Sequence, residues 1–346
     1  MRYAEPQGGK DRVAGLITPK KIKKPMKITK TPNTLTPISE GLIFAFDTEQ
    51  SEPRDVLVEI INHLTDEVVA TQQLCGVTQG EVDIAPYVER FAFRHPSSYT
   101  TTTILDEGYK AIYKIRIDDT VSPIVVVSTN SVSVATPQIL SDMPSCRTIC
   151  DGESDEVLLF APLGSNVMVK VFAGNDELAS FSQSSHYGVV RFTLVAADFY
   201  SKESVRVVFH SNTLIVGELH YNIVAPSRGD LRLAWVSDSG AIERYTFPFS
   251  RKVRREVERK RIEREPLPRT IGVATRYNLH LASRYERLAT IEALQQIISS
   301  PRVWIDLGEQ FQRVEVLNSS VEQGLQGKPG CVELELCLWR REVAQC

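Results

Sequence analysis

The stretch from Leu231 to Phe249, LRLAWVSDSGAIERYTFPF, constrains the fold of this chain more than any other. Apolar residues alternate with other types from Leu231 to Trp235, which is the period of a strand with one buried face. The run 237–240, Ser-Asp-Ser-Gly, has the chemistry of a tight turn, and Gly240 can adopt the positive φ that many tight turns need. The aromatic-rich sequence that follows returns as a second strand. We therefore predict a β-hairpin, and it contains no catalytic or metal-ligating cluster.

Two segments before the hairpin, residues 36–135 and 136–225, have the patterning of β-sandwich domains. Each contains short, alternating, β-branched stretches that turn residues separate, and Gly174-Asn175-Asp176 has the sequence of a hairpin turn. The predicted strands are Leu42–Phe46, Val56–Ile61, Glu67–Leu74, Tyr109–Ile117, Ile124–Ser128 and Ser131–Ala135, then Glu156–Phe160, Val167–Phe172, Glu177–Phe181, Val189–Leu194, Ser204–His210 and Leu214–Val224. The sequence therefore predicts two tandem Ig-like β-sandwiches.

Three stretches within these domains have a different pattern. Glu81–Val88 is expected to end a strand in a short helical turn. Arg94–Glu107 is polar, with four consecutive threonines from Thr100, and indicates a loop or protruding hairpin. Such a loop is a lid in an enzyme and a contact loop in an assembly protein. Residues 136–150, TPQILSDMPSCRTIC, are predicted to be a linker.

The last segment, residues 226–346, is predicted to be an α+β oligomerisation domain. After the hairpin, Ser250–Arg269 alternates charge and hydrophobe and favours either an exposed β-ribbon or a solvated helix. A helix is expected from Arg284 to Ser299, because Ser283 and Glu286 have the spacing of a capping box and apolar residues line one face. The remaining predicted strands are Arg269–Leu281, Arg302–Asp306, Phe311–Leu317 and Cys331–Glu342.

Positive charge is concentrated in two places. Residues 1–35 hold nine basic and two acidic side chains, and residues 251–269 hold nine basic and four acidic ones. Since the whole chain has a net charge of −3, the rest of the chain is acidic. Proline and glycine interrupt residues 1–35, so we predict an extended basic arm there. This distribution favours electrostatic docking between copies of the chain. Nucleic acid is the alternative partner, although no aromatic residue interleaves the basic strip.

No motif points to enzymatic chemistry, a cofactor or a metal. Gly8-Gly9-Lys10 and Gly327-Lys328 lack the frame of a P-loop, and no G-x-S-x-G sequence is present. Cys146 and Cys150 lie near acidic residues (Asp151, Glu153, Asp155 and Glu156), but their spacing is not that of a zinc site. We interpret this region as linker cysteines beside a solvated acidic loop. The six histidines form no metal-binding pattern.

The sequence also indicates the cellular compartment in which the protein is made. It contains no apolar run of about 18 residues, as a membrane helix requires, and no apolar region that would make its N-terminus a secretory signal. The six cysteines have no disulfide-framework spacing for a chain of 346 residues. These features indicate reduced thiols and synthesis in a cytoplasm.

From Leu231 onward the order of features resembles structural proteins of tailed-bacteriophage tails. The shared features are the W-x-x-x-x-G hairpin from Trp235 to Gly240, the sequence YTFPF at 245–249, a charged ribbon, a helix that ends in SSPRVW at 299–304, and a closing alternating strand. Distal-tail and tail-tip proteins often join β-sandwich modules to a tube- or hub-like α+β domain. The resemblance implies a homo-oligomeric ring, often sixfold, that joins the tail tube to tip or receptor-binding components.

The leading hypothesis is thus a non-enzymatic phage tail protein, made in the host bacterial cytoplasm and located in the virion. The ring would form by strand pairing between copies, and the arm would clasp a neighbour. The expected interface residues are Lys20, Lys21, Lys23, Lys24, Trp235, Arg251, Arg254, Arg255, Arg259, Arg261 and Trp339. The alternatives are a neck or connector protein of the virion, an Ig-like module that binds carbohydrate or a cell surface, and an enzyme with a sandwich accessory part.

Overall fold

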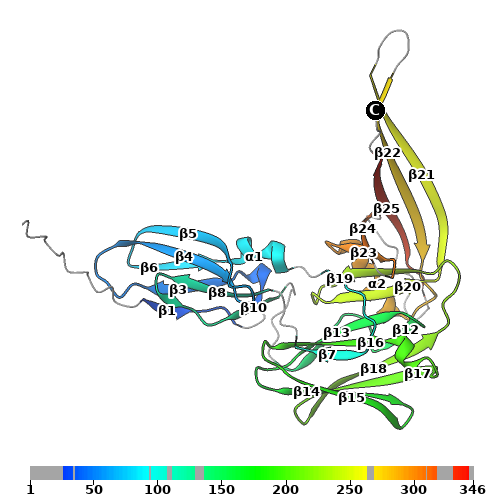
Figure 1. The fold of residues 1–346 in the computed structure, drawn as a ribbon, viewed down its shortest axis with the longest axis horizontal. Coiled ribbons are helices and arrows are strands. Elements are labelled where there is room, and N and C mark those ends of the chain that lie inside the picture. Colours follow the sequence, from blue (N-terminus) through cyan, green and yellow to red (C-terminus); the bar gives the residue numbers. More distant parts are fainter. Residues whose placement is uncertain are drawn as a thin grey trace, which may run out of the picture.

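The computed structural model describes residues 26–33, 36–92, 95–106, 111–128, 136–262, 269–308, 310–317 and 330–342. Strands make up most of this part of the chain, and its two α-helices are short, α1 (Ala85–Ala92) and α2 (Leu288–Ser299). The prediction of a mainly β protein is confirmed. Two β-sandwiches are followed by a third domain, from which a long ribbon of strands projects (Figure 1).

The first sandwich packs a small sheet against a larger one. The small sheet has the order β1 (Lys27–Lys30), β3 (Ile43–Asp47), β6 (Gln79–Asp83). The larger sheet has the order β2 (Thr36–Pro37), β10 (Val125–Ser128), β8 (Ile112–Ile117), β4 (Arg54–Asn62), β5 (Val68–Val77), and β9 (Thr120–Val121) pairs with β8. A short 3₁₀ helix, η1 (Ile38–Glu40), precedes β3.

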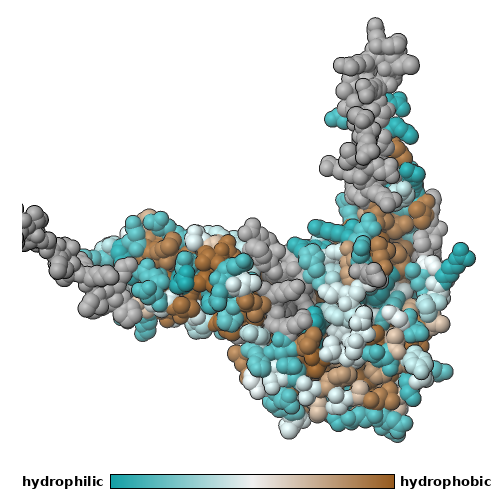
Figure 2. Space-filling model, viewed as in Figure 1, coloured by the Kyte–Doolittle hydropathy of each residue, from teal (hydrophilic) through white to brown (hydrophobic). Residues whose placement is uncertain are grey.

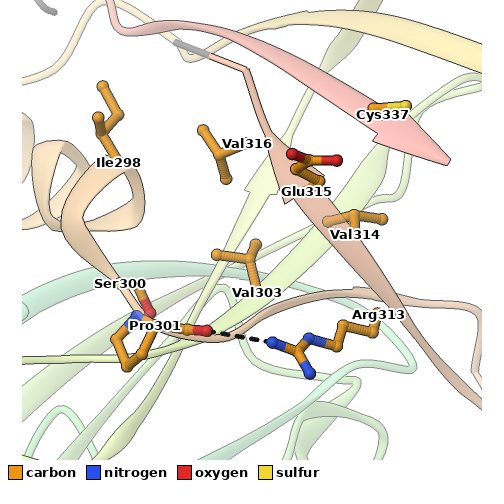
Figure 3. A pocket seen from close by; sticks show the side chains of 9 residues that line it. All are labelled: Ile298, Ser300, Pro301, Val303, Arg313, Val314, Glu315, Val316 and Cys337. Atoms are coloured by element: carbon orange, nitrogen blue, oxygen red, sulfur yellow. Dashed lines mark hydrogen bonds between the residues drawn. The ribbon is translucent and has the colours of Figure 1, made fainter. Parts of the chain in front are cut away.

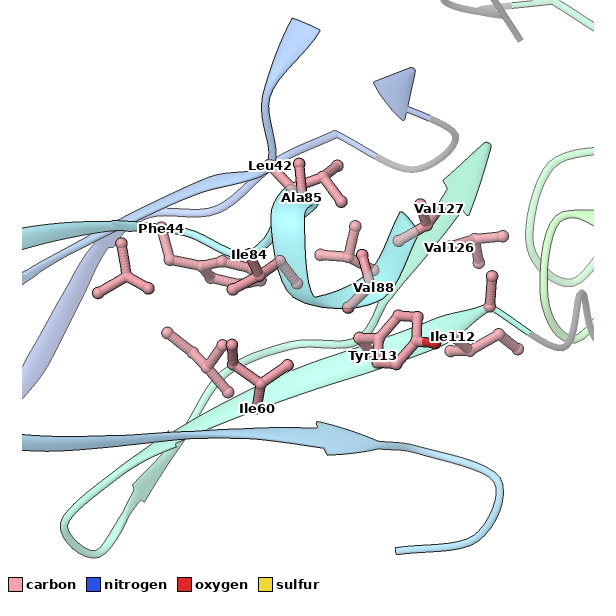
Figure 4. Close-up of a cluster of buried hydrophobic side chains, with 14 of the residues drawn as sticks. Leu42, Phe44, Ile60, Ile84, Ala85, Val88, Ile112, Tyr113, Val126 and Val127 are labelled. Carbon is pink, nitrogen blue, oxygen red and sulfur yellow. The ribbon is translucent and has the colours of Figure 1, made fainter. Parts of the chain in front are cut away.

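Alternation of side chains builds the core of the first sandwich. In β3, Phe44 and Phe46 are buried while the residues between them are only half-buried, because successive side chains of a strand face opposite sides. Phe44 meets Ile60 and Tyr113 from the opposite sheet, and α1 closes one end of the cluster through Val88 (Figure 4). The predicted step from a strand into a helical turn near residue 84 is present as β6 and α1.

The predicted arm is wrong in its last part. Within the segment 1–35, Lys27–Lys30 form strand β1, which pairs with β3 and places Ile28 opposite Phe46. Met26 is buried in the core of the sandwich. The exposed lysines at both ends of the strand give it a polar sequence, which local pattern does not distinguish from an extended arm. Residues 1–25 and the predicted strand Ser131–Ala135 lie outside the described residues.

The second sandwich has sheets of four and five strands. One has the order β11 (Gln138–Leu140), β13 (Ser154–Phe160), β16 (Val189–Val195), β7 (Thr103–Leu105). The other has the order β12 (Cys146–Cys150), β18 (Leu214–Val224), β17 (Ser204–Ser211), β14 (Asn166–Ala173), β15 (Asp176–Ser184). Its core lies between the sheets and includes Phe192, Phe209 and Tyr221. A 3₁₀ helix, η2 (Ala196–Phe199), follows β16, and Gly174 takes the turn between β14 and β15 with φ +59°.

Two predictions about this region are wrong. The polar stretch Arg94–Glu107 contains β7, an edge strand that pairs with β16 and so belongs to the second sandwich although strands of the first precede and follow it. The predicted linker 136–150 contains β11 and β12, which are edge strands of the two sheets. All three strands are three to five residues long, and their pairing partners are distant in sequence, so local periodicity does not reveal them.

The sheet of β13 and β16 is buried on both faces. Val157 and Leu159 of β13 pack into the core of the second sandwich, whereas Leu158 and Phe160 join the apolar cluster of the first sandwich. All seven residues of β13 are buried, and so are all seven of β16. The two sandwiches are therefore packed against each other and not simply strung along the chain.

The third domain has one sheet of seven strands and helix α2. The sheet order is β20 (Ile242–Phe247), β19 (Leu231–Val236), β23 (Val303–Asp306), β24 (Phe311–Val316), β25 (Glu333–Glu342), β22 (Arg269–Ala282), β21 (Phe249–Ile262). The predicted hairpin is confirmed, because β19 and β20 pair in register from Leu231 opposite Phe247 to Val236 opposite Ile242, and Gly240 in the turn has φ +73°. Ser250–Arg269 is a ribbon strand and not a helix over its described residues.

Helix α2 starts later than predicted, and the capping box is wrong. The helix begins at Leu288, and its N-cap residue Arg287 makes no side-chain capping bond. Both residues of the predicted capping box instead bond to groups that are distant in sequence. Ser283 Oγ accepts a hydrogen bond from the backbone N–H of Val332 at 2.9 Å. Glu286 pairs its backbone with Gly330, and its carboxylate accepts a bond from Tyr245 at 2.8 Å.

Candidate interaction surfaces

The ribbon is formed by β21, β22 and β25 and is the most extended feature of the third domain (Figure 1). β21 and β22 pair from Phe249 opposite Ala282 to Ile262 opposite Arg269. β25 pairs with β22 on the other side. In the order of the seven-stranded sheet β21 stands at the edge, so one side of this strand of 14 residues has no strand partner within the described part of the chain.

One face of the ribbon continues the core of the domain outward. Leu281, Leu334 and Leu336 are buried on this face near its base, beside α2. Farther along, strand alternation places Val253, Arg255, Val257 and Arg259 of β21 on the same face. Val253 is 60% exposed and Val257 is 38% exposed. We call these four residues the arginine–valine face. Figure 2 shows apolar colour that continues from the body of the domain onto the lower ribbon, beside hydrophilic residues.

The structure places the predicted interface residues differently. Arg254, Arg255, Arg259 and Arg261 are exposed on β21. Arg254 lies 3.2 Å from Glu256, and the Arg255 guanidinium lies 5.6 Å from the ring centre of Tyr277.

The other predicted interface residues are not on a described surface. Trp235 is 0% exposed in the core of the domain, so its assignment to an interface is wrong: the apolar face of its strand packs under α2. Arg251 and Trp339 lie on β21 and β25, but their side chains fall outside the described part. Lys20, Lys21, Lys23 and Lys24 are outside the described residues altogether.

A groove of about 550 Å³ lies where β24 diverges from β25. β24 pairs with β23 through residues 311–314 but with β25 only at Glu315 and Val316. Ile298, Val303, Val314 and Cys337 line the groove with Arg313, whose guanidinium donates to the carbonyl of Pro301 at 3.4 Å (Figure 3).

Nothing in the groove is prepared for catalysis. Burial and the nearby Glu315 raise the pKa of the Cys337 thiol, which keeps it protonated and weakly nucleophilic. Burial and the neighbouring Arg313 lower the pKa of Arg302. The groove is thus a recess of mixed polarity, in which the Cys337 thiol is not activated.

Buried charges join the second sandwich to the third domain. Arg232 of β19 is 6% exposed and donates to Glu153 at 2.6 Å, to Thr246 Oγ1 at 2.9 Å and to the carbonyl of Ser154 at 2.9 Å. Arg244 of β20 donates to the same carbonyl at 3.0 Å. Because a buried charge needs compensating bonds, these contacts fix how the hairpin lies on β13.

A second cluster of buried charges surrounds Arg147. Its guanidinium donates to Asp155 at 3.1 Å and lies 3.7 Å from Glu243. Tyr221 donates to Asp155 at 2.9 Å, and burial raises the pKa of this phenol well above its ordinary value. Burial also raises the pKa of Glu243, although Arg147 and a bond from Ser141 at 2.6 Å oppose the shift. The charged groups of this cluster thus pair with one another, and the cluster stabilises the packing around Arg147.

The interpretation of residues 151–156 as a solvated acidic loop beside linker cysteines holds at the exposed Asp151 and is wrong for the other three carboxylates. Glu153 is the partner of Arg232, and Asp155 and Glu156 are 4% exposed. Tyr99 donates to Glu156 and lies beneath the guanidinium groups of Arg191 and Arg244, whose carbons are 5.1 Å and 5.5 Å from its ring centre. The sequence signal for this cluster is the closely spaced set of carboxylates, Glu153, Asp155 and Glu156, at the start of a predicted strand.

Metal, thiol and membrane chemistry receive no support from the described residues. No group of three or more His, Cys, Asp or Glu side chains among them is arranged to hold a metal ion. Burial and Glu153 raise the pKa of Cys150 to about 11, so this thiol is not activated. Across the described ranges, no helix has the length and apolar character needed to cross a bilayer.

Comparisons with known proteins give no family. No protein-family model matches the chain, and no curated protein matches it. Among solved structures, the chain is similar to an Ig-domain complex of Dpr2 with DIP-Theta at 11% identity, covering 58% of this chain and all of that one, with a TM-score of 0.20. It is similar to an ice-binding adhesin of an Antarctic bacterium at 10% identity, covering 77% and 70%, with a TM-score of 0.17. The surface-layer protein SbsC, domains 4–9, gives 10% identity, 90% and 42% coverage and a TM-score of 0.21. Likenesses of this size do not establish a shared fold.

Proposed function

We propose that this protein is a non-enzymatic structural component of a phage or prophage tail that assembles into a ring of identical copies. In this proposal the two sandwiches are Ig-like modules, and the third domain is the tube- or hub-like oligomerisation domain. The ring would join the tail tube to the tip or to receptor-binding components. The protein would be made in the cytoplasm of the host bacterium and become part of the virion.

The observation that carries this proposal is the projecting ribbon with its unpaired edge strand. β21 is 14 residues long, and at least its described exposed part bears apolar side chains that a lone chain leaves in water. Unpaired strand edges are templates for pairing with another chain. A ribbon that extends beyond its own domain can reach a neighbouring copy, and a repeated head-to-tail contact closes a ring when its rotation permits.

The sequence features shared with tail proteins support the same proposal. The W-x-x-x-x-G hairpin opens the seven-stranded sheet, the charged segment forms the ribbon, and the helix before SSPRVW packs on the sheet. These are the elements whose order resembles distal-tail proteins. The buried charges hold the second sandwich and the third domain in a fixed arrangement, which suits an assembly role.

The test is the mass of the purified chain in solution, measured by light scattering at low and high salt. We expect a closed oligomer of fixed subunit number that loosens at high salt, because screening weakens contacts between exposed charges. A chain that remains a monomer over a wide concentration range would count against the ring and favour a module that binds a surface.

A shortened ribbon provides the matched variant. Replacing residues 256–275 by a short glycine-containing turn removes the outer ribbon and leaves Leu281 and Leu334 at its base. The body should stay folded and become monomeric. A second variant lacks residues 1–25 and keeps β1 intact, since β1 begins at Lys27. We expect it to assemble more weakly, as an arm that clasps a neighbour requires.

A further inference from the structure

Within the described part of the chain, the arginine–valine face of the ribbon is left largely uncovered, although Arg255 lies over the ring of Tyr277. Val253 and Val257 are exposed, and the exposed Arg255 and Arg259 alternate with them. Arg261 lies farther along the same strand and is also exposed. A partner that covers this face must offer apolar side chains to the valines and carboxylates to the guanidinium groups.

The outer face of the first sandwich has this complementary chemistry. Leu57 of β4 is 47% exposed, and Val121 of β9 is 51% exposed. β8 lies between these strands, so the two side chains lie on one continuous stretch of sheet. Asp55 precedes Leu57 by two residues on the same side of β4, and Asp119 lies in the turn between β8 and β9. Both carboxylates are exposed. We call these four residues the acidic face.

The cations near the acidic face are already paired. Arg116 donates to Glu59 at 2.5 Å, Arg54 lies 2.9 Å from Asp118, and Lys114 lies 2.7 Å from Asp66. Within the described part of the chain, no basic side chain forms an ion pair with Asp55 or Asp119. The sequence around the face is acidic overall, with 15 carboxylate and eight basic side chains in residues 26–128. Incoming arginines would therefore meet carboxylates that have no cation.

From this complementarity we infer that the arginine–valine face of one copy docks onto the acidic face of a second copy. The inference rests on the proposed function for its place in a ring, and it names the two surfaces that would meet. The first sandwich and the ribbon extend from the body of the molecule in different directions, so the two surfaces lie on separate projections of one copy (Figure 1). Two different surfaces in contact make a head-to-tail interface, which leaves one of each free at the ends of any open chain.

Two charge-reversed variants test the docking. The ribbon variant carries Arg255→Glu and Arg259→Glu, and the face variant carries Asp55→Lys and Asp119→Lys. All four positions are exposed, so both variants should fold. Each alone should lose self-association by at least about tenfold in dissociation constant, because like charges would meet at the interface. The control carries Arg228→Glu, an exposed arginine that belongs to neither surface, and should associate as the wild type does.

Mixing the two variants gives the sharper result. The ribbon variant keeps a native acidic face, and the face variant keeps a native ribbon, so these two surfaces match in an equimolar mixture. The reversed ribbon of the first variant also matches the reversed face of the second, so the mixture should recover assembly with the two variants alternating. A single chain with all four substitutions should regain higher assembly, since its glutamates would then meet lysines. Mass by light scattering distinguishes these outcomes.

The possible outcomes separate this inference from the ring itself. A closed oligomer that neither variant disturbs would overturn the docking and leave the ring standing. If the wild type forms open chains that lengthen with concentration, and both variants abolish them, the docking is supported and the closed ring is excluded. A ribbon variant that assembles normally but loses binding to duplex DNA would overturn the docking and assign the arginines to nucleic acid. A wild-type chain that stays monomeric even at high concentration would overturn both.

Discussion

At the scale of single residues, Glu243 makes stability depend on pH. Its carboxyl is buried at the junction of the second sandwich and the third domain, and burial raises its pKa above the ordinary value of 4.5. The folded state therefore holds this proton more tightly than the unfolded state does. Its contribution to stability is complete below pH 4.5 and is lost as the pH rises through the folded pKa. The stability lost is about 1.4 kcal/mol for each unit by which the folded-state pKa exceeds the unfolded-state pKa.

Glu243→Gln isolates this effect. The amide keeps an oxygen that can accept from Ser141 and from the N–H of Asp142, and it does not titrate. The free energy of unfolding of the variant minus that of the wild type should rise with pH above about 4.5 and then level off, as measured by urea denaturation at a series of pH values. A difference that is constant with pH would contradict the prediction.

Glu218→Gln is the matched control. His220 and Arg206 lower the pKa of this exposed carboxylate from 4.5. Its stabilisation is present above pH 4.5 and is lost as the pH falls through the folded pKa, so the difference between variant and wild type should have the opposite sign of pH dependence.

The residues of the buried clusters could not be predicted from local pattern. In LRLAWV, Arg232 occupies a polar position of an alternating strand, and alternation alone assigns it to solvent. It is buried because β13 covers that face of the hairpin and supplies the carbonyl of Ser154, while Glu153 lies directly before this strand. Trp235 is a related case. The alternation of its strand predicts a buried face, but it does not show whether the same domain or a partner chain buries that face.

At the scale of elements, long strands were predictable and short bridging strands were not. β14, β17 and β18 are each at least eight residues long, and the predicted strands coincide with them. β7 has three residues and depends on pairing with β16, which the sequence around it does not encode. The same holds for β11 and β12. The charges of the outer ribbon obscure both the strand period and the helix period, so its sequence favours neither. It is a strand because β21 pairs with β22, which in turn pairs with β25.

Strand β7 should stabilise the edge of the second sandwich at β16. It pairs Ile104 with Phe192, and Thr102 Oγ1 accepts a bond from the N–H of Val195 at 3.0 Å. Ile104→Pro removes a backbone donor and a buried side chain, so we expect a loss of about 2–3 kcal/mol in the stability of the second sandwich. Hydrogen exchange measured by mass spectrometry should show faster exchange in β16, while β4 and β8 of the first sandwich stay protected.

Ile104→Val is the control for β7. It keeps the backbone donor and most of the side chain, so it should cost about 0.5–1.5 kcal/mol and leave exchange in β16 slow. Unchanged protection of β16 in Ile104→Pro would show that β7 is not needed to hold this edge of the sheet.

At the scale of the whole molecule, the second sandwich and the third domain should unfold as one unit. Arg232 and Arg244 come from the hairpin of the third domain, and both donate to the carbonyl of Ser154 on β13. Breaking a buried charge pair by removing one partner costs about 3–5 kcal/mol, because the remaining charge stays buried without compensation. Cooperative unfolding of the two domains depends on such contacts across their junction.

Arg232→Ala should therefore uncouple the two domains. It leaves Glu153 without its buried cation, since the bond at 2.6 Å is lost. Differential scanning calorimetry should show a single transition for these domains in the wild type and two separate transitions in the variant, with the third domain unfolding first. Lys170→Ala is the control: it removes an exposed pair with Glu177 on the same sandwich, at 2.8 Å, which is worth at most about 1 kcal/mol. If Arg232→Ala lowers the transition temperature but keeps one transition, the apolar contacts of β13 and β20 are sufficient to couple the domains, and the charges only add stability.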